Sequence, residues 1–290
     1  MSLIKLEPLI PYEEAIRDVP PDCFVEVNGQ SVYVRDEGAG PVIVMLHGFA
    51  SSSYAFRELL GPLSQRYRLL AIDLNGFGLT ERPRRSKDYR IESQVDLIIE
   101  ILKGKSISEV VMLGHSYGSA VSAVLATRYP EWVKKVILVS PPSEFAESPP
   151  WYVRNGIGVA TAYFMIRALL SNPEKYRELS GKSVYVEGVL TKEVSETYRR
   201  SMLIEGLKKA CSGYAKAFGG DVTESIRYEA VQQSTLVIVG EKDAVVSAKS
   251  CIAVAGKIPE SSLVMLPDCG HCPPEEKPRE VVSAILDFLS

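Results

Sequence analysis

The stretch Val110-Val-Met-Leu-Gly-His-Ser-Tyr-Gly118 is the most informative part of this sequence. Its first four residues form an unbroken apolar run, which predicts a strand buried on both faces. From Tyr117 to Tyr129 the apolar residues recur at helical spacing, so the strand leads directly into a helix. Between them, Gly114 and Gly118 flank Ser116 in the pattern Gly-x-Ser-x-Gly, in which a sharp turn lifts a serine hydroxyl above the end of a sheet. The stretch therefore predicts that Ser116 is a nucleophile.

Similar apolar runs recur along the chain and alternate with helical segments. The further strand-like runs are Val42–Leu46, Leu69–Ile72, Val136–Val139, Leu236–Val239 and Leu263–Leu266. The helical segments are Ala55–Tyr67, Ile91–Leu102, Ser247–Lys257 and Glu275–Leu289. Before them, Cys23–Asn28 and Ser31–Arg35 alternate in polarity around Gly29-Gln30, which predicts a hairpin. This order predicts an α/β fold, with a mostly parallel sheet and helices on both of its faces.

One region, from Pro141 to Tyr228, breaks the alternation. It contains no comparable buried strand but has helical segments rich in aromatic residues. Because an unstructured loop of that length would be unusual, we expect a helical insertion folded over the sheet as a lid. The predicted division is a core of residues 1–140 and 229–290 and a lid of residues 141–228. Trp151, Tyr163 and Phe164 are candidates for the substrate pocket, although most lid aromatics could equally form the core of the lid.

A serine hydroxyl needs a neighbouring base, and the chain has three histidines. His47 follows a strand and His115 lies inside the turn, which leaves His271, on a loop just after the last strand-like run. A triad also needs an acid to hold the base in one tautomer. Asp243 follows the Leu236–Val239 run, and the order Ser116, Asp243, His271 suits this arrangement. The weaker competitors for the acid are Glu241, Asp268 and Glu144. A surface histidine and a capping aspartate are the structural alternatives.

The turn His47-Gly48-Phe49-Ala50 provides a candidate oxyanion hole. It follows the Val42–Leu46 run and precedes a helix. Backbone N–H groups that point at a developing oxyanion each contribute about 3 kcal/mol to catalysis. We expect these donors to be the N–H groups of Phe49 and Tyr117. His47 and Gly48 are expected to support the loop.

Taken together, these motifs resemble the α/β-hydrolase superfamily, most closely its lid-bearing esterase, lactonase and carbon–carbon hydrolase branch. The resemblance rests on His47–Phe49, Asp73–Pro83, Gly114–Gly118, Gly240–Asp243 and Gly270–Pro273. It covers Phe24 to Leu289 outside the lid, and it implies an eight-stranded sheet with the lid inserted after strand six. Asn75 stands where relatives commonly carry proline, with no catalytic effect expected. Epoxide hydrolases and haloalkane dehalogenases also resemble the chain but use aspartate at the turn, so Ser116 argues against both activities.

Composition limits the partners and the compartment. The 290 residues include 33 Lys and Arg against 36 Asp and Glu, a formal net charge of −3, so no nucleic-acid partner is expected. The basic run Arg82–Lys87 reads as a solvated loop. Five cysteines, an odd number, indicate reduced thiols. With no signal-peptide pattern and no apolar stretch of membrane-spanning length, we expect a cytoplasmic monomer or homodimer that acts on a small molecule.

Two further motifs suggest ligands but do not complete a site. Gly76-Phe-Gly78 lacks the third glycine of a dinucleotide fingerprint. Cys269-Gly-His-Cys272 lacks a second pair of zinc ligands at suitable spacing. We therefore expect no metal and no organic cofactor. A redox role for Cys269 and Cys272 beside the histidine stays open.

These residues predict a serine hydrolase that cleaves a small, mainly hydrophobic carboxylic ester through an acyl-enzyme on Ser116. One alternative uses the same triad to hydrolyse a carbon–carbon bond or a lactone. A second is a binding protein that senses a ligand on this scaffold with little turnover.

Overall fold

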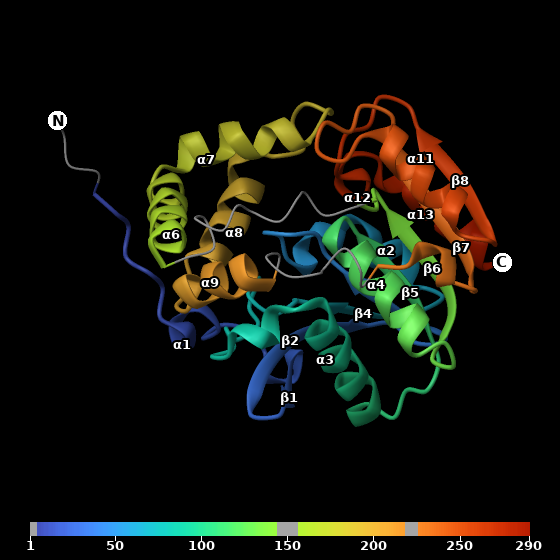
Figure 1. The fold of residues 1–290 in the computed structure, drawn as a ribbon, viewed down its shortest axis with the longest axis horizontal. Coiled ribbons are helices and arrows are strands. Elements are labelled where there is room, and N and C mark those ends of the chain that lie inside the picture. The colour runs from blue at the N-terminus through green and yellow to red at the C-terminus, as the bar shows by residue number, and fades with distance from the viewer. Residues whose placement is uncertain (1–4, 144–155, 218–225) are drawn as a thin grey trace.

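The computed structural model describes residues 5–143, 156–217 and 226–290. At its centre lies an eight-stranded sheet of order β1-β2-β4-β3-β5-β6-β7-β8 (Figure 1). The strands are β1 (Phe24–Val27), β2 (Gln30–Glu37), β3 (Val42–Leu46), β4 (Arg68–Ile72), β5 (Val110–His115), β6 (Val133–Val139), β7 (Ser234–Gly240) and β8 (Ser261–Leu266). The pairs β1–β2 and β2–β4 are antiparallel and the other neighbours are parallel. The predicted eight-stranded, mostly parallel sheet is confirmed.

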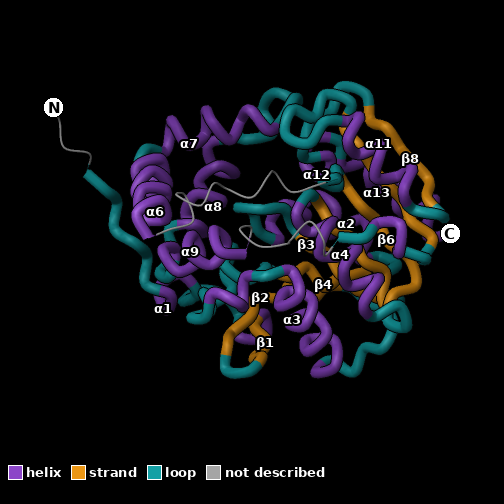
Figure 2. Tube along the Cα trace, in the orientation of Figure 1, coloured by secondary structure: helices purple, strands orange, loops and turns teal. Residues whose placement is uncertain are grey.

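Helices cover both faces of the sheet, as predicted (Figure 2). One face packs against α2 (Arg57–Ser64) and α13 (Pro278–Leu289), and the other against α3 (Ile91–Gly104), α4 (Tyr117–Arg128) and α11 (Ala248–Lys257). The core also contains two short helices. These are α1 (Tyr12–Ala15), which precedes the sheet in the sequence, and α12 (Pro273–Glu276), which follows β8. The expected helix Glu275–Leu289 is divided between α12 and α13, because Pro278 begins a new helix more readily than it continues one.

Two strand predictions differ in detail. The hairpin turns at Asn28-Gly29, one residue before the expected position, because both residues adopt positive φ (52° and 76°), as a tight hairpin turn requires. The run Leu263–Leu266 is not buried on both faces, since Leu263 is 41% exposed. Met265, two residues on and therefore on the same face, is 42% exposed, so one face of this edge strand is open to solvent.

The helical insertion after β6 is confirmed. Its described helices are α6 (Gly156–Leu170), α7 (Pro173–Ser180), α8 (Lys192–Met202) and α9 (Leu207–Ala217), which lie together on one side of the molecule in Figure 1. The N-terminal segment also packs here. The N–H of Ile10 donates to the carbonyl of Leu203 (2.9 Å), and the Ile10 carbonyl accepts from the N–H of Glu205 (2.9 Å). Residues from the beginning of the chain therefore pack against the insertion.

Arg82 joins the insertion to the core, although it opens the basic run expected to be solvated. Its guanidinium is buried and donates to the carbonyls of Phe77, Gly78 and Thr80. The same group donates to the Ser201 carbonyl of α8 at 2.7 Å. Burial lowers the pKa of Arg82 to about 10, so it stays charged at neutral pH. The prediction that the basic run is solvated is therefore wrong for Arg82, because four carbonyl groups replace water around its charge.

Candidate active site

Ser116 occupies the turn between β5 and α4 in a strained backbone conformation, with φ 51° and ψ −116°. Few residues other than glycine adopt positive φ, so surrounding contacts must hold the turn. A Cβ on Gly118 would lie 2.0 Å from the Leu46 carbonyl oxygen, and one on Gly114 would lie 2.3 Å from the Gly118 carbonyl oxygen. Neither position can hold a larger residue. The two glycines let β3, β5 and α4 approach closely enough to form the turn.

Two hydrogen bonds anchor this turn to neighbouring backbone. The N–H of Ser116 donates to the carbonyl of Val139 at 2.8 Å, which ties the turn to the end of β6. The hydroxyl of Ser119, in the first turn of α4, lies 2.7 Å from the Gly114 carbonyl oxygen. The position of Ser116 is therefore set by the sheet and the helix together.

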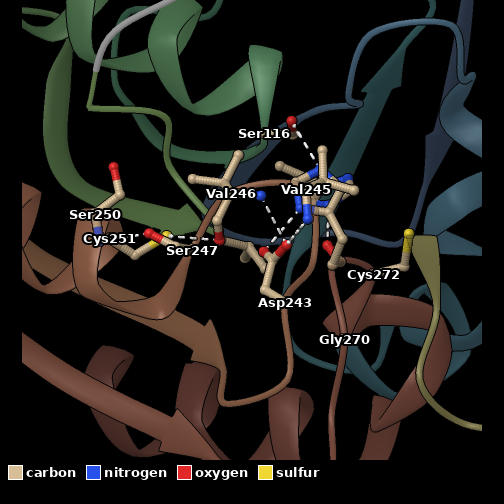
Figure 3. A network of polar contacts seen from close by, with 12 residues as sticks. Ser116, Asp243, Val245, Val246, Ser247, Ser250, Cys251, Gly270 and Cys272 are labelled. Carbon is tan, nitrogen blue, oxygen red and sulfur yellow. Dashed lines mark hydrogen bonds and ion pairs between the residues drawn. The ribbon is translucent and has the colours of Figure 1, made fainter. Parts of the chain in front are cut away.

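The structure brings Ser116, His271 and Asp243 together at the carboxyl ends of the strands (Figure 3). His271 Nε2 lies 3.0 Å from Ser116 Oγ, and its Nδ1 lies 2.8 Å from Asp243 Oδ2. The other carboxylate oxygen of Asp243 accepts the N–H groups of Val245 and Val246, each at 2.8 Å. Asp243 follows β7 and His271 follows β8, so residues far apart in sequence form one line of hydrogen bonds.

Asp243 is held in its ionised form. Burial would raise its pKa, but the hydrogen bond and charge of His271, with the N–H groups of Val245 and Val246, outweigh burial and lower it. A carboxylate only accepts hydrogen bonds, so the proton of a neutral His271 must sit on Nδ1. Its Nε2 lone pair then points at the hydroxyl of Ser116. This is the arrangement in which an imidazole can remove a proton from serine.

The competing carboxylates lie elsewhere. Glu241 is exposed and lies 3.4 Å from the ammonium group of Lys242. Asp268 is exposed in a turn with φ 48°, and Glu144 lies outside the described residues. Of the acids considered from sequence, Asp243 is the one hydrogen-bonded to His271.

The loop after β3 passes beside the nucleophile. A Cβ on Gly48 would lie 3.2 Å from Ser116 Cβ. His47 is fully buried, and its Nε2 accepts the N–H of Leu74 at 3.0 Å, so its Nδ1 carries the proton that is donated to the Gly48 carbonyl at 2.7 Å. Burial lowers the pKa of His47, which keeps the ring neutral. His47 therefore holds the loop through hydrogen bonds on both ring nitrogens.

The two expected oxyanion donors belong to two chain segments next to Ser116. Phe49 belongs to the loop beside Ser116, and Tyr117 is the first residue of α4, where backbone N–H groups point out of the helix N-terminus. Both residues therefore adjoin the nucleophile turn, and their role as oxyanion donors stays a prediction.

An aromatic cluster that was not predicted from the sequence lies beside the nucleophile turn. The ring of Phe49 lies 5.0 Å from those of Phe77 and Tyr214 and 6.2 Å from that of Tyr117, measured between centroids. Tyr214 comes from α9 and is buried, whereas the side chain of Phe49 is 48% exposed. The aromatic content of the insertion was visible in the sequence, but nothing in it distinguished Tyr214 from its neighbours.

Of the three aromatic residues predicted for the substrate pocket, Tyr163 and Phe164 lie on α6, and their role in the pocket stays a prediction. Tyr163 accepts a hydrogen bond from Arg167 (3.0 Å) and packs against the apolar cluster of the insertion helices. Phe164 is 50% exposed, and Trp151 lies outside the described residues. The position of Tyr163 agrees with the alternative that lid aromatics form the core of the lid.

The two cysteines beside His271 have unreactive surroundings. Cys269 is fully buried, and burial raises its pKa to about 12; burial and the nearby charges of Glu275 and Glu276 raise the pKa of Cys272 well above its usual value. Thiols react as thiolates, so these raised pKa values argue against a redox role.

We expect iodoacetamide at pH 8 to leave both thiols, Cys269 and Cys272, unmodified in the native protein and to alkylate both after unfolding, as read by peptide mass spectrometry. Rapid native alkylation of Cys272 would contradict this expectation.

Within residues 5–143, 156–217 and 226–290, no group of three or more His, Cys, Asp or Glu side chains is arranged to hold a metal ion. Over the same residues, every helix is too short or too polar to cross a bilayer.

The sequence and the fold of this chain are similar to those of known proteins. A family model described as the alpha/beta hydrolase fold matches residues 41–278. This chain belongs to the α/β-hydrolase fold family. The resemblance inferred from its motifs is therefore confirmed.

Several known hydrolases are similar over nearly the full length of the chain. The uncharacterized hydrolase YugF of Bacillus subtilis is 28% identical over 267 residues, which cover 91% of this chain and 96% of YugF. Lipase 1 of Psychrobacter immobilis is 27% identical over 290 residues, which cover 97% of this chain and 88% of the lipase. A solved structure of the meta-cleavage product hydrolase CumD from Pseudomonas fluorescens IP01 has a TM-score of 0.74 at 22% identity and covers 92% of this chain and 96% of that chain.

Proposed function

We propose that this α/β hydrolase is a serine hydrolase with Ser116 as nucleophile, His271 as general base and Asp243 as the acid that orients it. The observation that supports this proposal is the pair of contacts made by His271, 3.0 Å from Nε2 to Ser116 Oγ and 2.8 Å from Nδ1 to Asp243 Oδ2. The core of residues 1–140 and 229–290 would supply these groups, and the insertion of residues 141–228 would cover them.

In the proposed reaction, Ser116 Oγ attacks the substrate carbonyl while its proton passes to His271 Nε2. The N–H groups of Phe49 and Tyr117 stabilise the negative oxygen of the tetrahedral intermediate. His271 then gives the proton to the leaving alcohol, and an acyl-enzyme remains. Water, deprotonated by His271, releases the acid and restores the serine. No metal or organic cofactor takes part in these steps.

We propose a small, mainly hydrophobic carboxylic ester as the substrate. The half-exposed ring of Phe49, which packs against the buried rings of Phe77 and Tyr214, offers an apolar surface beside Ser116. The similarity to Lipase 1 of Psychrobacter immobilis is in keeping with an ester bond.

The test combines a fluorophosphonate probe with p-nitrophenyl esters from acetate to octanoate. We expect one probe per chain, attached to Ser116, and ester turnover whose chain-length optimum measures the pocket. Turnover of lactones or vinylogous diketones without ester turnover would assign the same triad to a lactonase or a carbon–carbon hydrolase. Labelling without any turnover would favour the ligand-sensing alternative, and absence of labelling would overturn the triad.

A further inference from the structure

Glu276, the last residue of α12, holds a buried carboxylate that binds four backbone N–H groups. Its side chain accepts from Cys272 on Oε1 (2.9 Å) and from Gly270 (2.8 Å), Tyr185 (2.8 Å) and Val186 (3.0 Å) on Oε2. The residue is only 6% exposed. Hydrogen bonds from N–H groups to a charged, buried acceptor are among the stronger ones in proteins, so this carboxylate is a rigid junction.

Two of these four donors flank His271 directly. Gly270 precedes it and Cys272 follows it on the chain segment that passes beside Asp243 in Figure 3. The backbone of His271 is bound as well, since its N–H donates to the Ser183 carbonyl at 3.0 Å. Three consecutive N–H groups around the histidine are therefore bound either by Glu276 or by the insertion.

His115, the neighbour of the nucleophile, completes this set of contacts. Its Nε2 lies 2.7 Å from the His271 carbonyl oxygen. Burial, reinforced by the charge of His271, lowers the pKa of His115 to about 3, so the ring is neutral and its Nε2–H donates to that carbonyl. The nucleophile turn thus also holds the segment that carries the base.

The packing at Gly270 shows how closely the insertion approaches. A Cβ at this position would lie 2.6 Å from the backbone nitrogen of Tyr185 and 2.9 Å from Glu276 Oε1. Both distances are too short for a real side-chain atom. The insertion backbone at Tyr185 and Val186 is therefore in direct contact with the loop that carries His271.

We infer that Glu276 is a positioning residue that sets the orientation of His271 and joins insertion residues 183–186 to it. The inference rests on the proposed role of His271 as general base. Glu276 does not touch the reacting atoms in this arrangement; it acts through the backbone on either side of the imidazole. The insertion accordingly does more than cover the substrate, because its backbone helps to align the base. Alignment within about 0.5 Å is what efficient proton transfer requires.

Glu275 offers a matched control from the adjacent position. It is also a buried carboxylate on α12, and burial raises its pKa despite the charge of Arg57. Its partners are side chains: Arg57 Nη1 at 2.5 Å and the hydroxyl of Tyr198 at 3.0 Å. Removing its charge perturbs α12 without removing an acceptor from the N–H groups around His271.

The experiment compares Glu276→Gln with Glu275→Gln and with the wild-type protein. In Glu276→Gln, an amide –NH2 must face at least one N–H donor, so the segment around His271 shifts. We expect kcat on a p-nitrophenyl ester to fall roughly 10- to 100-fold with KM nearly unchanged. We expect kcat in Glu275→Gln to stay within about threefold of wild type, because this change leaves the N–H groups around His271 bound and the base in position. Circular dichroism and thermal melts would set a temperature at which all three proteins are folded.

An NMR measurement makes the result independent of turnover. The Nδ1 proton that His271 shares with Asp243 should give a downfield resonance in the wild type and in Glu275→Gln, and a broadened or shifted one in Glu276→Gln. The inference is overturned if the resonance and kcat are unchanged in Glu276→Gln, or if both glutamine variants lose them equally. If Glu276→Gln does not fold, Glu276→Asp keeps the charge but withdraws it by one methylene, and the same comparison applies. A failure of the proposed function would appear separately, as an unlabelled wild-type Ser116.

Discussion

Replacing Ser116 with alanine should lower kcat for ester hydrolysis by about 10⁵- to 10⁶-fold, because it removes the only atom that can form the acyl-enzyme. The loss should not come from unfolding. Alanine keeps the Cβ and the N–H that bonds to Val139, so the free energy of unfolding should stay within about 1 kcal/mol of wild type. Steady-state kinetics, fluorophosphonate labelling and chemical denaturation measure the three quantities.

Ser122 provides the matched control on the same helix. Its hydroxyl is buried and makes no hydrogen bond with any side chain or backbone group that the structure describes. Ser122→Ala should therefore keep kcat within about twofold of wild type and leave stability unchanged or slightly higher, since an unpaired buried hydroxyl contributes nothing favourable. Full turnover by Ser116→Ala, or equal losses in both variants, would refute the assignment of the nucleophile.

Asp243→Asn is expected to have the second largest effect, a loss in kcat of about 10⁴-fold. The asparagine oxygen can still accept the N–H groups of Val245 and Val246, so the loop should keep its shape. Its amide group, however, donates a hydrogen bond to Nδ1 of His271 where the carboxylate accepted one. The imidazole proton then moves to Nε2, which faces Ser116 and can no longer accept the hydroxyl proton.

Asp268→Asn tests whether the correct acid has been assigned. Asp268 precedes His271 by three residues, but it is exposed in a turn whose positive φ asparagine tolerates well. We expect kcat of Asp268→Asn to stay within about twofold of wild type, because a surface substitution away from the site changes little. Steady-state kinetics across pH 6 to 9 would compare the two variants. A large loss in Asp268→Asn with an active Asp243→Asn would exchange their roles.

Features of this protein that depend on local pattern could be predicted from its sequence. Buried parallel strands need unbroken apolar runs, so β3 to β7 could be recognised one by one. The glycines around Ser116 could be recognised because a tight turn between a strand and a helix leaves no room for side chains. Chain order and a count of three histidines then predicted His271 as the base and Asp243 as the acid, since parallel strands present their carboxyl ends at one edge of the sheet.

Contacts between segments distant in sequence could not be predicted in this way, because they depend on how the whole chain folds. Leu263 lies on the exposed face of the edge strand β8, although its apolar run looked like the others. Arg82 is buried because carbonyl groups from the core and from α8 surround it, and no local pattern encodes that meeting. Glu276 lies beside ordinary helix residues in the sequence, and its four N–H partners come from two separate loops. Local sequence specifies backbone conformation, whereas burial and the partners of a charged side chain depend on which distant segments the fold brings beside it.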